Sequence, residues 1–308
     1  MSKANEFILV TNALTKQYGN HKALNALSMH VPKGAIYGFV GKNGAGKTTL
    51  IRLITGLQMP TSGSYELYGR QSGEKDIAKS RRRVGAVVET PSIYQNMTAR
   101  QNLIQQSILL GLPSYEGIDE ILDLVGLSNT GKKKVKNFSL GMKQRLGIAV
   151  ALIGSPDFLI LDEPVNGLDP QGIVEIRELI LKLNREKQIT FVISSHILDE
   201  LSKLASHYGF IDKGSIVKEI SAKEMEAVCR KCLRLTVSDT ASLARVLDDR
   251  QLAYTIISDT EADIYGDITI TDLTLSLAQA GCTVQAMHEH DESLEAYYIG
   301  LVGGESNE

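Results

Sequence analysis

The stretch Gly41-Lys42-Asn43-Gly44-Ala45-Gly46-Lys47-Thr48 decides the fold, because it fits the phosphate-binding pattern G-x-x-x-x-G-K-[ST] at every fixed position. The apolar residues 35–40 before it are typical of a buried strand, and residues 49–54 after it of a helix. A glycine-rich turn that binds nothing could carry the same letters, but strand, glycine loop and helix in this order are the context that the motif needs. The sequence therefore predicts a phosphate site at the start of this helix.

The predicted loop offers backbone amides, one ammonium group and one hydroxyl group to a nucleotide. Glycines let the backbone curl so that several N–H groups face one phosphate, and the helix start adds about half a positive charge. We expect Lys47 to reach the β- and γ-phosphates of ATP and the Thr48 hydroxyl to bind Mg²⁺. The residues expected to hold the nucleotide are Gly41, Lys42, Asn43, Gly44, Ala45, Gly46, Lys47, Thr48 and Thr49.

Two acids end a later apolar run, Phe158-Leu159-Ile160-Leu161, which is typical of a buried parallel strand. In a protein with a phosphate loop, an aspartate at the position of Asp162 holds Mg²⁺ directly or through water. Glu163 is then placed to orient or deprotonate the water that attacks the γ-phosphate. The alternative is a pair of acids that only cap the following turn.

Three further side chains have a functional and a structural interpretation, and the residues alone leave both open. Tyr18, just before a predicted hairpin turn at Gly19-Asn20, could stack on adenine or be an ordinary hairpin aromatic. Ser139 opens a long helix and could bind an anion or simply cap the helix. His196 ends the buried strand 190–196 and could contact the γ-phosphate or be a hydrogen-bonded structural histidine.

Strands and helices alternate over the first 200 or so residues, which predicts an α/β fold with a mostly parallel sheet covered on both faces. Residues 98–153 are mostly helical in pattern. Thr98 and Gln101 have capping-box spacing at the start of the first of these helices. Its apolar face is expected to contain Leu103, Ile104, Ile108 and Leu109.

Composition limits the possible function classes. The 308 residues are 43% hydrophobic and 22% charged, with a net charge of −3, so nothing favours nucleic acid as a partner. No apolar run approaches the ~20 residues that span a bilayer, and the polar start, residues 1–6, resembles no signal peptide. We therefore expect a cytoplasmic chain. Three cysteines, including the Cys229-x-x-Cys232 pair, favour reduced thiols over a redox or zinc site.

The tail, residues 221–308, has a pattern of its own. Strands at 233–237, 254–258, 262–265 and 282–287, with helices at 239–247 and 273–280, predict the split βαβ (ferredoxin-like) α+β fold. A final helix follows Asp291. His288, Glu289, His290 and Asp291 could bind a metal, although a solvated loop is the better interpretation. We expect a small regulatory or dimer-supporting domain.

Together, these motifs resemble the nucleotide-binding subunit of an ATP-binding cassette (ABC) transporter. Tyr18 stands at the adenine-stacking position, residues 41–48 at Walker A, and Glu89 at the Q-loop position. The helix start Ser139-Leu140-Gly141-Met142 is similar to the family signature, in which Ser139 and Gly141 contact the γ-phosphate. The remaining matches are Asp162-Glu163 as Walker B and catalytic glutamate, Leu168-Asp169 as D-loop, and His196 as switch histidine.

The resemblance covers residues 7–220 and implies a P-loop NTPase domain over 1–220, with an antiparallel β subdomain and a helical subdomain at about 90–155. Three positions depart from the family pattern. Glu89 replaces the usual glutamine; its carboxylate can still bind Mg²⁺ but donates no hydrogen bond unless protonated. The signature differs from L-S-G-G-Q at Phe138, Leu140 and Met142, and Asn166 stands where serine is common.

The resemblance also implies partners. One Walker A and one signature per chain imply a dimer, most simply a homodimer, with ATP sandwiched between subunits. A separate transmembrane permease would dock near Glu89 and hold the chain at the inner face of the membrane. Within the family, the stretches Glu89-Thr90-Pro91-Ser92-Ile93-Tyr94 and Ser293-Leu294-Glu295-Ala296-Tyr297-Tyr298 resemble the drug and bacitracin (lantibiotic-type) export branch.

Two other function classes use the same loop. A soluble ABC-type ATPase could act as a regulatory switch without a permease, but the acidic net charge and the single cassette argue against it. A GTPase or small-molecule kinase would leave the signature helix unexplained, and the chain has no N-K-x-D stretch to read guanine.

Overall fold

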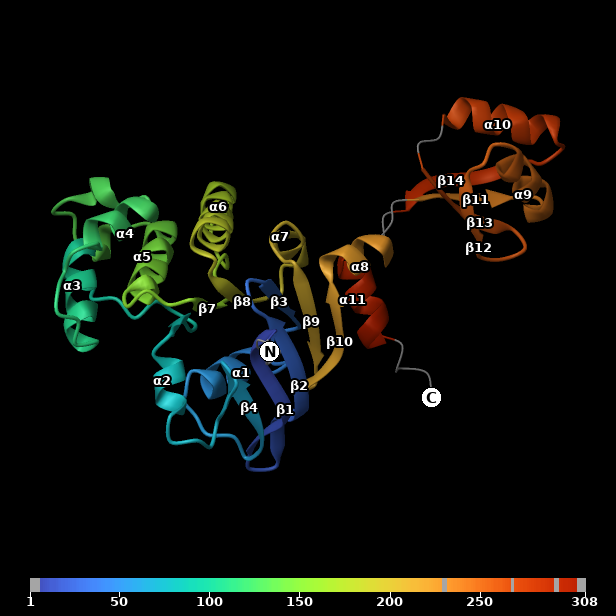
Figure 1. Cartoon of the computed structure of the whole chain (residues 1–308). Helices are drawn as coiled ribbons and strands as arrows, with labels where there is room; N and C mark the ends of the chain where they lie inside the picture. The colour runs from blue at the N-terminus through green and yellow to red at the C-terminus, as the bar shows by residue number, and fades with distance from the viewer. Residues whose placement is uncertain (1–5, 229–231, 267–268, 291–293, 304–308) are drawn as a thin grey trace, which may run out of the picture. The chain divides into compact units, whose positions relative to one another are not determined.

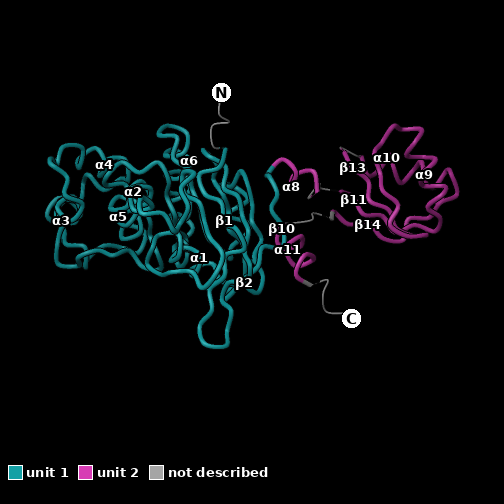
Figure 2. The backbone as a smooth tube through the Cα atoms, turned by 60° about the horizontal axis from the view of Figure 1, so that its bottom comes forward, with its two compact units in different colours: residues 1–222 teal, residues 223–308 magenta. Residues whose placement is uncertain are grey.

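The structure, a computed structural model, describes residues 6–228, 232–266, 269–290 and 294–303. The chain divides into two units, residues 1–222 and residues 223–308 (Figure 2). The domain boundary expected from the sequence lies after residue 220. The two units are described one at a time.

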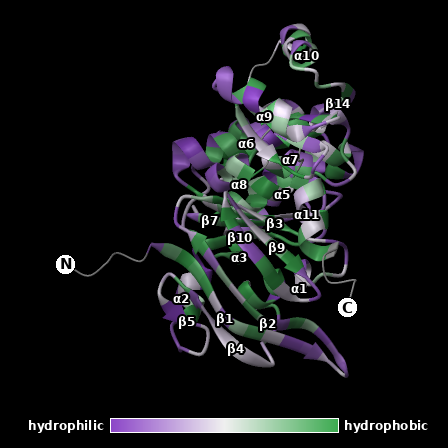
Figure 3. Cartoon of the chain, turned by 90° about the vertical axis from the view of Figure 1, so that its right-hand side faces the viewer, coloured by the Kyte–Doolittle hydropathy of each residue, from purple (hydrophilic) through white to green (hydrophobic). Residues whose placement is uncertain are grey.

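The core of the first unit is a six-stranded sheet in which all neighbours except β9 and β10 run parallel. Every residue of β3, β7 and β8 is buried, as expected for apolar runs with both sheet faces covered. Figure 3 shows β3 and β9 as largely hydrophobic. In spatial order the strands are β10 (Ser215–Ser221), β9 (His207–Asp212), β3 (Ile36–Val40), β8 (Thr190–Ser195), β7 (Phe158–Asp162) and β6 (Val84–Val87).

A second sheet, antiparallel throughout, forms the β subdomain of this unit (Figure 1). Its order is β2 (His21–Pro32), β1 (Phe7–Tyr18), β4 (Ser62–Leu67) and β5 (Arg70–Gln71). The β1–β2 turn falls at residues 19–20, as predicted, but both strands are longer than their apolar cores. Register shifts interrupt the ladder, and Ala13 and Ala26 adopt positive φ angles, so periodicity alone could not follow the strands across them.

The helices of the first unit cover the parallel sheet and form the helical subdomain. Its α3 begins with the predicted capping box, in which the Thr98 hydroxyl accepts from Gln101 N–H and the Gln101 side chain accepts from Thr98 N–H. The helices are α1 (Lys47–Ile54), α2 (Ile77–Arg81), α3 (Ala99–Leu109), α4 (Ile118–Leu124), α5 (Leu140–Leu152), α6 (Pro170–Lys187) and α7 (Leu198–Ser202), with 3-10 turns η1 (Ser128–Thr130) and η2 (Val135–Asn137).

The apolar face predicted for α3 is wrong at the C-terminal end of the helix. Ile108 and Leu109 are 51% and 64% exposed, whereas Leu103 is fully buried. Two polar residues, Asn102 and Ser107, are buried instead. Their side chains donate to backbone carbonyls, Asn102 to Tyr94 and Thr98 and Ser107 to Leu103, which removes the cost of burying them.

The second unit has the predicted split βαβ fold. Its antiparallel sheet has the order β12 (Ala253–Ile256), β13 (Glu261–Tyr265), β11 (Cys232–Val237) and β14 (Val284–His290). Helices α9 (Thr240–Asp249) and α10 (Ile270–Gln279) pack on one face, where Leu235, Leu243 and Leu273 are fully buried. Asp239 caps α9 by accepting from the N–H groups of Ala241 and Ser242, which lowers the pKa of its carboxyl group. Helices α8 (Ala222–Val228) and α11 (Leu294–Gly303) flank this fold in the sequence.

On the other face of this sheet lies a two-pronged ion pair. Arg234 Nε and Nη2 donate to the two carboxylate oxygens of Asp263 at 2.6 and 2.7 Å, and Asp263 is only 5% exposed. We predict that Asp263→Ala lowers the free energy of unfolding of the second unit by about 2 kcal/mol, because it removes two hydrogen bonds between charged groups and leaves the partly exposed Arg234 without this partner. Urea unfolding of the full chain, followed in the transition of this unit, measures the effect. The exposed Asp249→Ala serves as control, and an equal loss in both variants would contradict the assigned role.

Some sequence interpretations of the tail cannot be followed. Cys229, Asp291 and Ser293 lie outside the described residues, and Cys232 and Cys282 are buried. Within the described ranges, no group of three or more histidine, cysteine, aspartate or glutamate side chains is arranged to hold a metal. None of the helices in the same ranges is both long and apolar enough to cross a membrane.

Candidate nucleotide site

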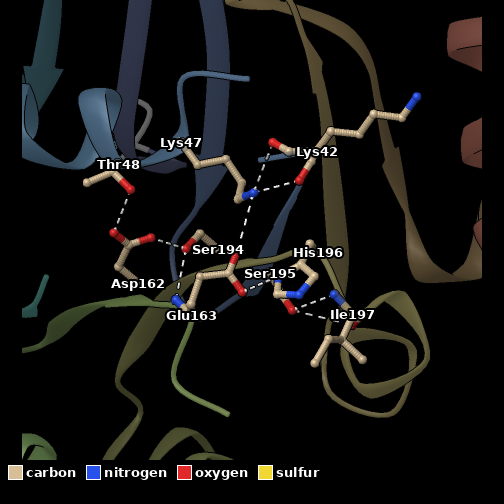
Figure 4. A network of polar contacts seen from close by, with 10 residues as sticks. Lys42, Lys47, Thr48, Asp162, Glu163, Ser194, Ser195, His196 and Ile197 are labelled. Atoms are coloured by element: carbon tan, nitrogen blue, oxygen red, sulfur yellow. Dashed lines mark hydrogen bonds and ion pairs between the residues drawn. The ribbon is translucent and has the colours of Figure 1, made fainter. Parts of the chain in front are cut away.

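The candidate site lies where β3, β7 and β8 end. The phosphate loop follows β3 and leads into α1, Asp162 and Glu163 end β7, and Ser194 to His196 end β8. Parallel pairing aligns Val40 with Ser195 and Asp162 with Ser194, so the polar residues that follow these strands meet at one edge of the sheet. Figure 4 shows them converging on Lys47 and Asp162.

Two positions of the loop require glycine, because neighbouring strands lie too close to leave room for a Cβ. Gly46 has φ +112°, and a Cβ there would lie 2.5 Å from the carbonyl oxygen of Ala23. A Cβ on Gly41 would lie 2.6 Å from the Ile211 side chain. The loop is therefore seated directly against β2 and β9, and a side chain at either position would push it out of place.

Lys47 is almost buried, at 6% exposed, with three oxygens around its ammonium group. Its Nζ donates to Gly41 O at 2.6 Å and Lys42 O at 3.3 Å, and lies 3.3 Å from Glu163 Oε1. That buried Glu163 oxygen has no hydrogen-bond partner in the described part of the chain. The ammonium group is thus held by loop carbonyls at the cavity, in a position where an anionic ligand would gain a strong interaction.

Thr48, Asp162 and Ser194 form a chain of hydrogen bonds across three elements (Figure 4). The Thr48 hydroxyl donates to Asp162 Oδ2 at 2.8 Å, and the Ser194 hydroxyl donates to Asp162 Oδ1. Asp162 is 2% exposed. A hydroxyl beside a buried carboxylate is a donor set that suits a hard cation such as Mg²⁺, so two of the three residues predicted to bind the metal, Thr48 and Asp162, lie together.

Glu163 is held in an unusual backbone conformation. Its φ is +49°, a region that side chains other than those of glycine and asparagine seldom occupy, and its N–H donates to the backbone and the hydroxyl of Ser194 at 3.1 and 3.0 Å. His196 Nδ1 lies 2.8 Å from Glu163 Oε2. The carboxylate is thereby fixed between Lys47 and His196, an arrangement typical of a functional site.

A cavity of about 360 Å³ runs over the phosphate loop. The half-exposed Tyr18 stands at its rim, as expected of a residue that could stack on a base, and Glu163 lines its inner end. The cavity is lined by Tyr18, His21, Ala23, Asn43, Gly44, Gly46, Lys47, Thr48, Thr49 and Glu163.

The sequence analysis missed four residues of this site: His21 and Ala23 in the lining, and Ser194 and Ser195 behind it. The two serines are 0% and 1% exposed, and Ser195 Oγ accepts from Ile197 N–H at 2.9 Å. The sequence feature that could have identified these serines is a pair of hydroxyl groups at the end of an otherwise apolar strand, because a buried polar group needs a hydrogen-bond partner. His21 and Ala23 reach the loop only through the folding of the hairpin, so no local pattern marks them.

Three predicted site residues lie outside the phosphate loop, this cavity and the polar network around Lys47 and Asp162. Glu89 has φ +59°, and its carboxylate pairs with Arg52 Nη2 on α1 at 2.5 Å. It lines a different cavity, of about 390 Å³, whose wall also includes Arg52, Leu57 and Pro91. Ser139 caps α5 by accepting from Met142 N–H at 3.2 Å, and Gly141 lies in the first turn of that helix.

Comparisons with known proteins agree with this geometry. The family model described as ABC transporter matches residues 24–166. The chain is 43% identical to the bacitracin transport ATP-binding protein BcrA of Bacillus licheniformis, over 96% of this chain and 98% of the relative. It is 40% identical to the protein of that name in Enterococcus faecalis, over 97% of both. A lantibiotic transport ATP-binding protein, SrtF of Streptococcus pyogenes, is 48% identical over 67% of this chain and 87% of the relative.

Solved structures show the same fold. The cbiO1 subunit from Clostridium perfringens, part of the ABC transporter complex cbiONQ, superimposes with a TM-score of 0.65 at 27% identity. The match covers 72% of this chain and 92% of that one. An ATP-binding cassette of an ABC transporter in its ADP conformation, MJ1267, gives a TM-score of 0.65 at 28% identity over 72% and 94% of the two chains.

Proposed function

The chain belongs to the ABC transporter family, in which it is an ATP-hydrolysing subunit, and from that premise we propose that it powers export of a bacitracin-like peptide antibiotic through a separate permease. The proposal rests on how much of this chain its relatives match. The two bacitracin transport relatives match 96% and 97% of this chain, which includes the second unit, whereas the lantibiotic relative matches 67%. The likeness to the bacitracin branch thus extends to the part of the chain that lies outside the ATPase.

The phosphate loop is proposed to hold ATP and Mg²⁺ with the residues named from the sequence. The backbone of residues 41–49 surrounds the phosphates, and Lys47 exchanges the carbonyls of Gly41 and Lys42 for phosphate oxygens. Thr48 and Asp162, whose Oγ1 and Oδ2 atoms lie 2.8 Å apart, would hold the metal, which would neutralise phosphate charge. Tyr18 stacks on adenine at the rim. Glu89 joins the metal site only when it leaves Arg52.

Glu163 is proposed to position and deprotonate the attacking water. Its oxygen Oε1 is buried, is ion-paired with Lys47 at 3.3 Å and accepts no hydrogen bond within the described residues, so it would be available to a water once Lys47 turns to the phosphates. Its other oxygen is oriented by His196 at 2.8 Å. His196 thus keeps Glu163 in place and can also contact the γ-phosphate.

We predict that His196→Ala lowers the turnover number of ATP hydrolysis by roughly 10²-fold, because the Glu163 carboxylate loses the donor that orients it. ATP binding is expected to change much less, since the phosphate loop is untouched. Steady-state phosphate release measures the turnover number, and a fluorescent ATP analogue measures binding. His207→Ala, which removes a histidine whose ring is hydrogen-bonded to Ser206, is the matched control. Equal turnover in the two variants would remove the role assigned to His196.

A second subunit completes the proposed ATP site. Ser139 and Gly141 do not line the cavity over their own phosphate loop. The start of α5 has an exposed Leu140 and free amide groups suited to an anion, so a second copy could place Ser139 and Gly141 on the γ-phosphate. The permease is proposed to dock on the helical subdomain near Glu89, which would place the chain at the inner face of the membrane.

Antibiotic susceptibility tests the proposed substrate class. We predict that a sensitive bacterium carrying this chain with its native permease tolerates several times more bacitracin than one carrying the permease with Glu163→Gln. Tolerance to an unrelated antibiotic of similar size is the control. Equal bacitracin tolerance in both strains would reject this substrate and leave the ATPase assignment in place.

A further inference from the structure

The second unit presents a sheet edge that the described chain does not cover. Strand β12 is the outermost strand beside β13, and no strand within the described ranges pairs with its other side (Figure 1). An open edge offers unpaired N–H and C=O groups to any extended chain of matching register. Which groups face outward follows from the ladder.

Two hydrogen bonds fix the ladder. Ile257 N–H donates to Glu261 O at 2.9 Å, and Val237 N–H donates to Thr260 O at 2.8 Å. Antiparallel hydrogen bonding alternates by two residues, so Thr255 and Ala253 also bond toward β13. Tyr254 and Ile256 must then turn their N–H and C=O groups outward, which gives four backbone groups on the free edge.

The side chains of this edge do nothing to discourage pairing. Residues 251–258 read Gln-Leu-Ala-Tyr-Thr-Ile-Ile-Ser, with no charge and no proline. Ile256 and Ile257 are 43% and 48% exposed. The opposite edge, β14, carries exposed His288 and Glu289 and a register shift in its pairing with β11, the features by which sheet edges are protected. The β14 edge of this sheet is therefore protected against pairing with another strand, whereas the β12 edge has neither charge nor proline.

We propose that β12 pairs with β12 of a second copy of this chain, antiparallel and centred on Thr255, to form one continuous sheet across two second units. In this register Tyr254 and Ile256 of one copy face Ile256 and Tyr254 of the other, and the four outward groups make four hydrogen bonds. The aromatic and β-branched side chains meet on the same face, a favourable cross-strand pair. The outward groups lie on Tyr254 and Ile256, symmetrically about Thr255, so an identical strand in antiparallel register satisfies all four, which is why a second copy is the occupant. The contact needs no nucleotide and is independent of the transport function.

Charge placed on the two-fold axis tests this register. Thr255 is exposed and lies opposite itself in the dimer, so Thr255→Lys and Thr255→Glu each place like charges face to face. Sedimentation velocity of the nucleotide-free full chain should show a reversible dimer for the wild type. The dissociation constant should rise roughly tenfold or more for each variant alone, since opposed like charges destabilise the pair. An equimolar mixture of the two variants should recover the dimer.

The matched control is Gln285→Lys, which places the same charge on the exposed surface of β14 and should leave the dimer unchanged. Circular dichroism establishes that each variant is folded. The proposal is overturned if the nucleotide-free wild type is monomeric at all concentrations, which would leave the edge for a different chain. It is equally overturned if both variants dimerise like the wild type, or if the mixture fails to restore association. None of these results bears on ATP hydrolysis, because nucleotide is absent.

Discussion

Glu163→Gln is expected to lower ATP turnover by roughly 10²- to 10⁴-fold while the chain still binds ATP, because an amide cannot accept the proton of the attacking water. The substitution keeps the size of the side chain. It also removes the negative charge 3.3 Å from Lys47 Nζ, so ATP binding should be as tight as in the wild type or tighter. Phosphate release gives the turnover number, and a fluorescent ATP analogue gives the affinity.

The control for this prediction is Glu178→Gln, an exposed residue of α6 that takes no part in the site. Its turnover should equal that of the wild type. If Glu163→Gln hydrolysed ATP at the wild-type rate, the water-activating group would have to be sought elsewhere, and the constrained geometry of Glu163 would need another explanation.

Lys47→Ala is expected to weaken ATP binding by roughly 10- to 100-fold, because hydrogen bonds to a charged group contribute about 1.5–3 kcal/mol each. Turnover at subsaturating ATP should fall at least in proportion. The ammonium group is already confined by the carbonyls of Gly41 and Lys42, so little ordering is needed for it to meet a phosphate. Equilibrium titration with a fluorescent ATP analogue measures the loss.

Two controls distinguish the loss of the Lys47 contact with ATP from a general effect of Lys47→Ala on folding. Lys22→Ala on the β2 strand removes an exposed lysine bonded to Asn25 and should bind ATP normally. A thermal melt of each variant reports on folding. Wild-type affinity in a folded Lys47→Ala chain would mean that the loop holds nucleotide by its backbone alone, and the role of Lys47 would be wrong.

The fold could be predicted from this sequence because its strongest signals are local. The glycine loop between strand and helix, the apolar runs that became β7 and β8, and the Asp239 cap of α9 are each contained in a few consecutive residues. The same holds for the order of strands and helices in the second unit. The ends of elements were misjudged, as in β1 and β2, where bulges break the two-residue period, and β9 and β10 were not predicted.

The parts that could not be predicted depend on tertiary packing and on long-range contacts. Ile108 and Leu109 fit a helical stripe, yet Asn102 and Ser107 take the buried face because backbone carbonyls satisfy them. The pairing of Glu89 with Arg52 is equally invisible, since 37 residues separate the two and no spacing rule joins them. The sequence also could not reveal that Ser194 bridges Asp162 and Glu163, because that contact exists only once β7 and β8 pair.

The most direct test of the proposed role is to identify what the chain binds in its native membrane. A tagged full chain is purified in mild detergent, and the proteins that accompany it are identified and quantified by mass spectrometry. The proposed function predicts a polytopic membrane protein at a ratio near one to one. Recovery of the chain alone, or with ribosomal or DNA-bound proteins only, would contradict the transport role while leaving the ATPase site intact.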